Sequence, residues 1–470
     1  MDTNRRDFIK GAATVMAALP TFRTLSNDHT LGPDADPINL GIIGFGSQGA
    51  TLSEAAMQIP GVRIRAVCDI WDLSRNKARA YCRGMKQEAN AYTDYREMLE
   101  KEDKNIDIVL VATPDWMHAE HTNACLRAGK HVYCETPMAN SLSRAKSMAQ
   151  TQRETGKFLQ IGNQRRSNPR YIHAINRIIR GSDMLGRIPH AYAQWNRSVA
   201  PFVFVRQRVY LPTETLEQYG YENMEQFLNW RWFAKYGNGP FMDRGSRQVD
   251  LFLWAWDCAP ASVTAVGDND FYRRQMHDNV TASYEFKTKD GNTSRALYQV
   301  LMTTSKGHFY EQFMGENGTL TISEYSDSVS CEMHEGVPAW HTFVAQGLIR
   351  EHPLKKRVGT RVPVAITCVP TPEIYAGRGA DDSFPCVLYK RGNEFWFDVG
   401  RNSYRLPIDL RKPAHMPHLE NFILAVRQNR PDLLTCPPEV AYRTLVAVLA
   451  ANESIAKRQT ITFTPEDFVV

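Results

Sequence analysis

An apolar run that leads directly into three spaced glycines constrains this chain more than any other feature. Residues 39–43 (Asn-Leu-Gly-Ile-Ile) precede Gly44, Gly46 and Gly49. The run predicts a buried strand, and the glycine spacing predicts a tight turn from that strand into a helix. Gly44 permits the turn, Gly46 lets a pyrophosphate approach the backbone, and Gly49 lets the helix pack against the strand. The first amide groups of the helix would then face the phosphates.

A second apolar run supports the interpretation of this turn as a dinucleotide-binding loop. Residues 62–68 predict another strand, and Asp69 follows it, twenty positions after the last glycine. An acid in that place binds a ribose diol and repels a 2′-phosphate, so NAD is favoured over NADP. Phe45, Ser47 and Gln48 complete the predicted cofactor loop. The alternative is a glycine-rich turn without a function.

Length and composition favour two domains and a small substrate. The chain has 470 residues, of which 43% are hydrophobic, which is enough for two cores. The 56 basic and 51 acidic residues give a net charge of +5 and no large field of one sign, which argues against a nucleic-acid partner. Nine scattered cysteines show no C-x-x-C pair and no metal-ligand spacing, so no metal is expected.

The first 33 residues predict an export signal that lies outside the fold. Arg5 and Arg6 precede a mildly apolar stretch over residues 11–19, an order that resembles a twin-arginine signal. It implies the twin-arginine export machinery as a partner and a periplasmic or otherwise exported location. The alternatives are the start of a helix or a retained anchor. Because the apolar part is too short to cross a bilayer, no integral membrane span is expected.

Two later strands are predicted to deliver polar residues to the same sheet edge. Residues 106–112 form an apolar run typical of a strand buried on both faces of a parallel sheet, and Thr113, Pro114 and Asp115 follow it. Ligands bind beyond the carboxyl ends of such strands, so this tripeptide should border the nicotinamide. The alternative is a loop whose proline only stops the strand. The next strand, residues 131–134, leads into Glu135-Thr136-Pro137.

These motifs resemble the Gfo/Idh/MocA family, also called glucose-fructose oxidoreductase-like proteins. The resemblance rests on the glycine turn, Ala112-Thr113-Pro114, residues 128–132 (Ala-Gly-Lys-His-Val) and Glu135-x-Pro137, in this order. It implies an α/β Rossmann domain over residues 34–165 and an NAD(P)-dependent oxidoreductase acting on CH-OH groups. It also places Glu135 and Gln164 among the cofactor-binding residues.

The second domain, residues 166–470, is predicted as an α+β domain with a mixed or antiparallel sheet. Five alternating runs between residues 262 and 323 support the sheet. In the family one face of this sheet covers the substrate and the other can form a dimer, so a homo-oligomer is implied. Residues 201–225, rich in aromatic and turn residues, are interpreted as a loop over the site.

Two catalytic positions differ from the family pattern. Thr136 replaces the usual lysine and cannot supply a cation, while Arg247 replaces the usual histidine and cannot act as a general base. One interpretation relocates the charge: Arg247 supplies the cation, and Asp243 or Tyr236 takes the proton. The other is a structural ion pair between Asp243 and Arg247 in a protein that binds cofactor without turnover.

Four more side chains are candidates for substrate binding. Arg165 and Arg166, in a segment that resembles the family's interdomain G-x-Q-R-R, can clamp a carboxylate or a set of sugar hydroxyls, or can be solvated arginines of a helical turn. Trp230 and Trp232 can stack on sugar rings or pack in a core.

The predicted function is hydride transfer with a sugar, glycoside or sugar derivative, using a tightly bound, recycled cofactor. The alternatives are an NAD-dependent glycosidase acting through a keto-sugar intermediate and a non-catalytic sugar- or cofactor-binding homologue.

Overall fold

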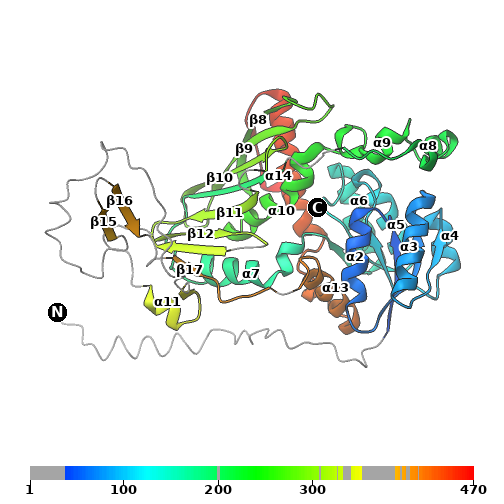
Figure 1. The fold of residues 1–470 in the computed structure, drawn as a ribbon, viewed down its shortest axis with the longest axis horizontal. Coiled ribbons are helices and arrows are strands. Elements are labelled where there is room, and N and C mark those ends of the chain that lie inside the picture. Colours follow the sequence, from blue (N-terminus) through cyan, green and yellow to red (C-terminus); the bar gives the residue numbers. More distant parts are fainter. Residues whose placement is uncertain are drawn as a thin grey trace.

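The protein consists of two domains that lie side by side (Figure 1). The computed structural model describes residues 37–197, 202–305, 308–324, 327–331, 340–351, 387–391, 394–398, 403–410 and 412–470. The predicted twin-arginine signal lies outside the described residues.

The N-terminal domain is built on a parallel sheet of six strands. These are β1 (Ile38–Ile43), β2 (Val62–Cys68), β3 (Asn90–Tyr92), β4 (Ile108–Val111), β5 (His131–Cys134) and β6 (Leu159–Ile161). Their order in space is β3-β2-β1-β4-β5-β6, and each neighbouring pair is parallel. This order reverses direction between β1 and β4, as in doubly wound dinucleotide-binding folds. The predicted Rossmann domain is therefore confirmed.

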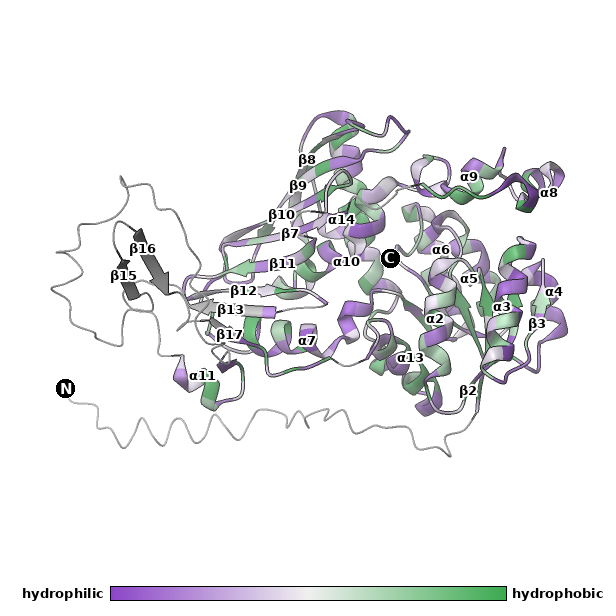
Figure 2. Ribbon diagram, in the orientation of Figure 1, coloured by the Kyte–Doolittle hydropathy of each residue, from purple (hydrophilic) through white to green (hydrophobic). Residues whose placement is uncertain are grey.

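Helices cover both faces of this sheet because its central strands are apolar on both sides. The helices are α2 (Ser47–Met57), α3 (Asp72–Gly84), α4 (Tyr95–Lys101), α5 (His118–Arg127) and α6 (Leu142–Thr155). Every residue of β4 is buried. The helices combine hydrophobic and hydrophilic residues along their length, as expected of elements that bury one side only (Figure 2). A late helix, α13 (Met416–Gln428), joins this core through Leu419 and Phe422, so the chain returns to its first domain.

The C-terminal domain contains a mixed sheet, as predicted. Its strands are β7 (His190–Asn196), β8 (Pro260–Asp268), β9 (Asn279–Lys287), β10 (Thr293–Leu301), β11 (Phe309–Met314), β12 (Gly318–Ile322), β13 (Asp327–Cys331), β14 (Arg350–Glu351), β17 (Ser403–Arg405) and β18 (Ile461–Thr462). The order is β14-β17-β13-β12-β11-β7-β10-β9-β8-β18. Only β7 and β10 pair in parallel among the described strands of this sheet. A separate hairpin joins β15 (Val387–Arg391) and β16 (Glu394–Asp398).

Two long helices pack against the mixed sheet. They are α10 (Gly239–Trp256), which contacts β7 and β10, and α14 (Pro438–Lys457), which contacts β8. Among the described residues one helical stretch, Pro431–Lys457, is long and apolar enough to cross a membrane, yet 56% of its apolar window is buried inside the protein. This burial is what a core helix requires. The carboxyl ends of the Rossmann strands face α10, so the site lies between the two domains.

The segment predicted as a loop over the site contains short helices. These are η4 (Gln207–Val209), α8 (Thr213–Gln218) and α9 (Met224–Leu228). They extend from the second domain across the Rossmann domain (Figure 1). The Trp71 indole N–H donates a 2.8 Å hydrogen bond to the Val209 carbonyl, and Trp116 packs edge-on against Tyr221 with ring centroids 5.8 Å apart. The segment is therefore a structured cover, held by aromatic contacts.

Candidate active site

A cleft of about 650 Å³ lies between the two domains. Its floor is the edge of the parallel sheet where β1, β2, β4 and β5 end. The second domain supplies the opposite wall from α10 and from η5 (Trp230–Trp232), and residues 218–221 and 227–228 of the cover close one side. A cavity of this size is in the ordinary range for a small-molecule site.

The glycine turn has the shape that a phosphate-binding loop requires. Gly44 adopts φ +90°, and a Cβ there would lie 2.7 Å from the Ala112 carbonyl oxygen. A Cβ on Gly49 would collide with the carbonyl of Gly44, so the helix packs tightly on the turn. At Gly46, in contrast, a Cβ would meet no atom of the described chain within 4 Å. The helix α2 starts there without a side-chain cap, which leaves its first amide groups available to an anion.

Asp69 holds this loop in place from the end of β2. One of its carboxylate oxygens accepts a 2.8 Å hydrogen bond from the Phe45 amide, and the other accepts one of 2.8 Å from the Trp71 amide. Burial raises the pKa of Asp69. Asp69 also lines the cleft, as a ribose-binding acid must. Phe45 contributes its backbone only, because its side chain is buried in the core.

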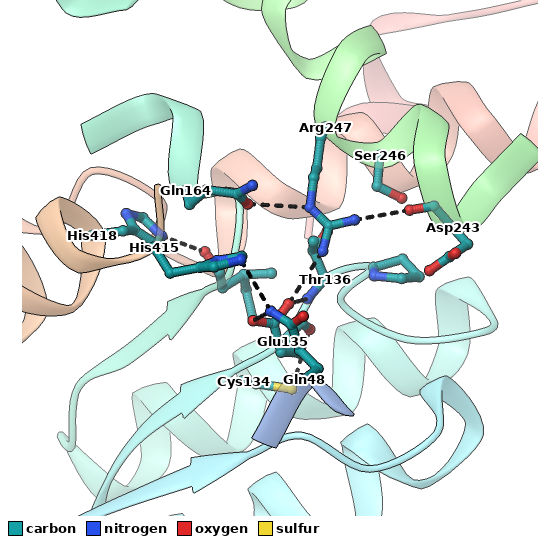
Figure 3. A network of polar contacts seen from close by, with 12 residues as sticks. Gln48, Cys134, Glu135, Thr136, Gln164, Asp243, Ser246, Arg247, His415 and His418 are labelled. Carbon is teal, nitrogen blue, oxygen red and sulfur yellow. Dashed lines mark hydrogen bonds and ion pairs between the residues drawn. The ribbon is translucent and has the colours of Figure 1, made fainter. Parts of the chain in front are cut away.

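Glu135 links the cofactor loop to the opposite wall (Figure 3). Its Oε1 accepts a hydrogen bond of 2.9 Å from Gln48, which follows Ser47 at the start of α2. Its Oε2 accepts from the Thr136 amide at 3.1 Å and lies 3.4 Å from Arg247 Nη2. The carboxylate therefore fixes the orientation of Gln48 and of Arg247 together. Thr113 and Pro114 line the same edge of the cleft.

Arg247 occupies the cleft wall as a cation held by three contacts. Its Nε donates to Gln164 Oε1 at 3.1 Å, and Nη1 donates to the backbone carbonyl of Asp243 at 3.1 Å (Figure 3). The third contact is with Glu135. Gln164 does not itself line the cleft and instead supports Arg247 from behind. The side-chain ion pair proposed between Asp243 and Arg247 is not what the structure shows.

The Asp243 carboxylate pairs with two other arginines. Its Oδ2 lies 3.2 Å from Nε of Arg231 and 3.2 Å from Nε of Arg244. Burial alone would raise the pKa of Asp243, but Arg244, Arg231 and Arg247 outweigh burial and hold that pKa well below its ordinary value. Asp243 therefore stays ionised and is a poor proton acceptor. This corrects the sequence-based interpretation in which Asp243 takes the proton.

Asp115, the last residue of the tripeptide predicted to border the nicotinamide, is a titratable group on the cleft that had been given no catalytic role. It begins the short helix η1 (Asp115–Met117), directly after Thr113 and Pro114, and lines the cleft while only 4% exposed. Burial raises the pKa of Asp115 well above its ordinary value, the charge of Asp243 raises it further, and Arg231 and Arg247 offset only part of this effect. Its position after the strand was the available sequence signal.

Comparison with known proteins decides the family. Residues 38–163 match the model of the oxidoreductase family with an NAD-binding Rossmann fold, and residues 214–321 match the GFO/IDH/MocA C-terminal domain. The chain belongs to the Gfo/Idh/MocA family. Its N-terminal domain is the NAD-binding domain of that family, and NAD is the cofactor.

Curated relatives of this Gfo/Idh/MocA protein match through part of their length. An inositol 2-dehydrogenase of Salmonella typhimurium is 30% identical over 175 residues, 37% of this chain and 50% of that protein. A 4-carboxy-2-hydroxymuconate-6-semialdehyde dehydrogenase of a Sphingobium species is 33% identical over 145 residues, 31% and 44% of the two chains. A glycosyl hydrolase family 109 protein of a Shewanella species is 27% identical over 175 residues, which are 33% of this chain and 38% of that protein. The chain thus spans half or less of these relatives.

Solved structures share the fold over nearly the whole chain. The WlbA dehydrogenase from Bordetella pertussis, crystallised with NADH and UDP-GlcNAcA, has a TM-score of 0.59 at 18% identity and covers 91% of this chain and 98% of its own. The aldose-aldose oxidoreductase from Caulobacter crescentus, complexed with glycerol, has a TM-score of 0.61 at 16% identity, with 91% and 100% covered. At these identities the likeness establishes the architecture.

Two further predicted site residues of this family member, Tyr236 and Trp232, lie away from the cleft. Tyr236 is fully buried, and its hydroxyl oxygen lies 2.8 Å from the Gly220 carbonyl oxygen and 2.7 Å from Gln226 Oε1, which share its single proton. It therefore holds the cover and is not placed to accept a substrate proton. Trp232 packs on Phe202 in the core, with ring centroids 5.3 Å apart, because its position in η5 turns it inward. Trp230 does line the cleft.

The two arginines at the domain junction are structural. Arg165 is 1% exposed and pairs with Glu311 of β11, while Arg166 binds both carboxylate oxygens of Asp250 on α10 at 2.7 and 2.8 Å. Neither lines the cleft. The predicted clamp for substrate is therefore wrong: each guanidinium already has a carboxylate of the second domain as its partner. Among the described residues no group of three or more His, Cys, Asp or Glu side chains could hold a metal ion.

Proposed function

We propose that this protein is an NAD-dependent oxidoreductase that oxidises a hydroxyl-bearing carbon of a sugar or sugar derivative, or runs the reverse reaction. The single observation that carries the proposal is Asp115. This buried carboxyl group with a raised pKa lies on the cleft at the strand end where the cofactor loop and Glu135 also converge. A group that can change its protonation state at that place supplies what the replaced family histidine would have supplied.

The residues present fit the cofactor. The open space at Gly46 admits a pyrophosphate, the uncapped start of α2 provides amide donors, and Asp69 lines the cleft at the far end of the loop. Glu135 and Thr113 would border the nicotinamide half. NAD, when bound, supplies a two-electron acceptor for hydride.

Proton transfer is assigned to Asp115. In the oxidation direction its ionised carboxylate accepts the proton of the substrate hydroxyl, and in the reduction direction its protonated form returns that proton. Arg247, oriented by Gln164 and Glu135, supplies positive charge next to the oxygen that loses the proton. Because Thr136 carries no charge, Arg247 supplies the positive charge that the lysine supplies in the family.

The cover supports a retained cofactor. Residues 203–228 contact the Rossmann domain through the hydrogen bond from Trp71 to Val209 and through the packing of Trp71 on Phe227, with ring centroids 5.8 Å apart. These contacts lie beside Asp69, so the cover would have to open before the cofactor could leave. A cofactor reoxidised within each turnover, by a second substrate or by a later step on the same sugar, suits such a closed site.

Export and self-association complete the proposal. Arg5 and Arg6 followed by a short apolar stretch support export through the twin-arginine route to the periplasm or beyond. That route carries folded proteins, so a retained cofactor would cross with the chain. Self-association is proposed from the family resemblance, in which one face of the mixed sheet can form a dimer.

Absorbance of the bound nicotinamide tests the function. Protein purified without added cofactor should carry NAD or NADH, and addition of a sugar panel should change its nicotinamide absorbance. Retained cofactor that responds to no sugar would favour the non-catalytic alternative. Release of a sugar from a glycoside, with bound NAD required and no net change in absorbance, would favour the keto-sugar glycosidase.

A further inference from the structure

Three arginines form the wall of the cleft that faces the sheet edge. Arg231 comes from η5, and Arg244 and Arg247 come from successive turns of α10. Arg247 uses three of its five N–H donors on Gln164, Glu135 and a backbone carbonyl. Arg231 and Arg244 are not used in the proton transfer described above, and their chemistry needs its own explanation.

The guanidinium ends of Arg231 and Arg244 are open to the cleft. Each contacts Asp243 through its Nε atom. Within the described chain, the terminal Nη atoms of these two residues have no hydrogen-bond acceptor, although both residues line the cleft. Arg166, by comparison, uses Nε and Nη2 on the two oxygens of Asp250. Two adjacent guanidinium forks without acceptors are suited to an oxyanion.

Aromatic rings hold these two guanidinium groups in position. The Arg231 guanidinium carbon lies 4.2 Å from the centroid of the Trp230 ring, and that of Arg244 lies 5.1 Å from the Trp195 ring. Trp195 is itself stacked on Phe309, with centroids 4.4 Å apart and planes 7° from parallel. Side chains that are already ordered lose little entropy when they bind a ligand, so this wall is preorganised.

The charge at this end of the cleft is positive. Burial lowers the pKa of Arg244, and neighbouring Arg231 and Arg247 lower it further, against the opposing effect of Asp243. The three arginines of this wall pair with only two carboxylates, those of Asp243 and Glu135, so the wall itself carries an excess of one positive charge. Asp115, on the sheet edge, balances that charge only when it is ionised. A single carboxylate balances that charge, whereas a phosphate monoester carries about two negative charges.

We propose that the substrate is a sugar acid and that its carboxylate binds the terminal nitrogens of Arg231 and Arg244. The inference rests on the proposed function and narrows its substrate class. Asp243 then acts as a positioning residue that holds both guanidinium groups through their Nε atoms. The sugar ring lies between this anchor and Asp115, which leaves a ring hydroxyl to face the nicotinamide edge.

Equilibrium binding to the NAD-loaded protein tests this inference. Titration calorimetry compares D-glucuronate and D-galacturonate with D-glucose, D-galactose and glucose 6-phosphate. We expect a uronate to bind at least about tenfold more tightly than its neutral counterpart. Arg231→Gln and Arg244→Gln should each weaken uronate binding by about tenfold and leave NAD affinity unchanged. Arg79→Gln, an exposed arginine of α3, is the matched control and should bind the uronate as the wild type does.

The outcomes separate the inference from the proposed function. Wild-type protein without any affinity for NAD would overturn the proposed function. NAD-loaded protein that binds neutral sugars as tightly as uronates, that binds no sugar acid, or whose uronate affinity survives both substitutions would overturn the inference alone. Tighter binding of glucose 6-phosphate than of glucuronate would overturn the assignment to a carboxylate.

Discussion

Asp115 and Asp243 line the same end of the cleft, and their surroundings displace their pKa values in opposite directions. Burial and the charge of Asp243 raise the pKa of Asp115. Arginines overcome burial at Asp243 and keep its pKa low. When the surroundings of two acids in an active site push their pKa values apart, the acid with the raised pKa can exchange a proton and the other stays ionised. We therefore assign proton transfer to Asp115 and an anchoring role to Asp243.

Asp243→Asn should destabilise the fold, because Arg231 and Arg244 would lose the anion that they share. Loss of one partner from a buried ion pair lowers the free energy of unfolding by about 3–5 kcal/mol. Because the Arg231 side chain is 43% exposed, we expect a smaller loss here, of about 2–3 kcal/mol. Since the folded pKa of Asp243 is depressed, its contribution is present above the ordinary aspartate pKa and disappears as the pH falls below it. Urea unfolding at several pH values measures both effects. Equal stability of variant and wild type at neutral pH would count against the anchoring role.

Gly46→Ala tests the cofactor loop, and Gly84→Ala, at the end of α3, is its matched control. In both positions a Cβ meets no atom of the described chain within 4 Å, and neither backbone requires a positive φ, so both variants should fold with near wild-type stability. Only Gly46 borders the cleft, where an added methyl group would keep a pyrophosphate from the backbone. Fluorescence titration should show weaker NAD binding for Gly46→Ala alone. Equal affinities in the two variants would contradict the assigned cofactor position.

Arg165→Gln tests whether the arginine at the domain junction has a structural role. The substitution leaves Glu311 buried and unpaired, and we expect a loss of about 3–5 kcal/mol in the free energy of unfolding. Glu311→Gln in the same chain should recover part of that loss, because it removes the uncompensated charge. Denaturant unfolding of the single and double variants measures this. Unchanged stability together with weaker sugar binding would restore the clamp that the sequence suggested.

The fold could be predicted because its signals are local. The glycine turn, the apolar runs and the acid after β2 each follow from a few neighbouring residues, and the structure places Gly44 and Asp69 accordingly. The cover was harder to predict: its helices α8 and α9 are short, and they depend on contacts with Trp71 and Trp116 far away in the sequence.

The site was predicted less well, because its chemistry depends on partners from both domains. A pair such as Arg165 and Arg166 looks like a clamp until Glu311 and Asp250 are brought beside it. Tyr236 is seven residues before Asp243 in the sequence, yet its hydroxyl faces the cover. Asp115 had a positional signal, but burial gave it its role, and burial is not visible in a sequence.

The pH dependence of cofactor reduction in Asp115→Asn tests the central claim most directly. The absorbance of bound nicotinamide is followed after a sugar substrate is mixed with cofactor-loaded protein at a series of pH values. Because oxidation needs ionised Asp115 and its pKa is raised, the wild-type rate should increase with pH as that carboxyl group loses its proton. Asp115→Asn should retain cofactor, react at least about 100-fold more slowly and lose this dependence, while Asp268→Asn, an exposed control, should follow the wild type. Reduction by Asp115→Asn at the wild-type rate, with the same pH profile, would contradict the account.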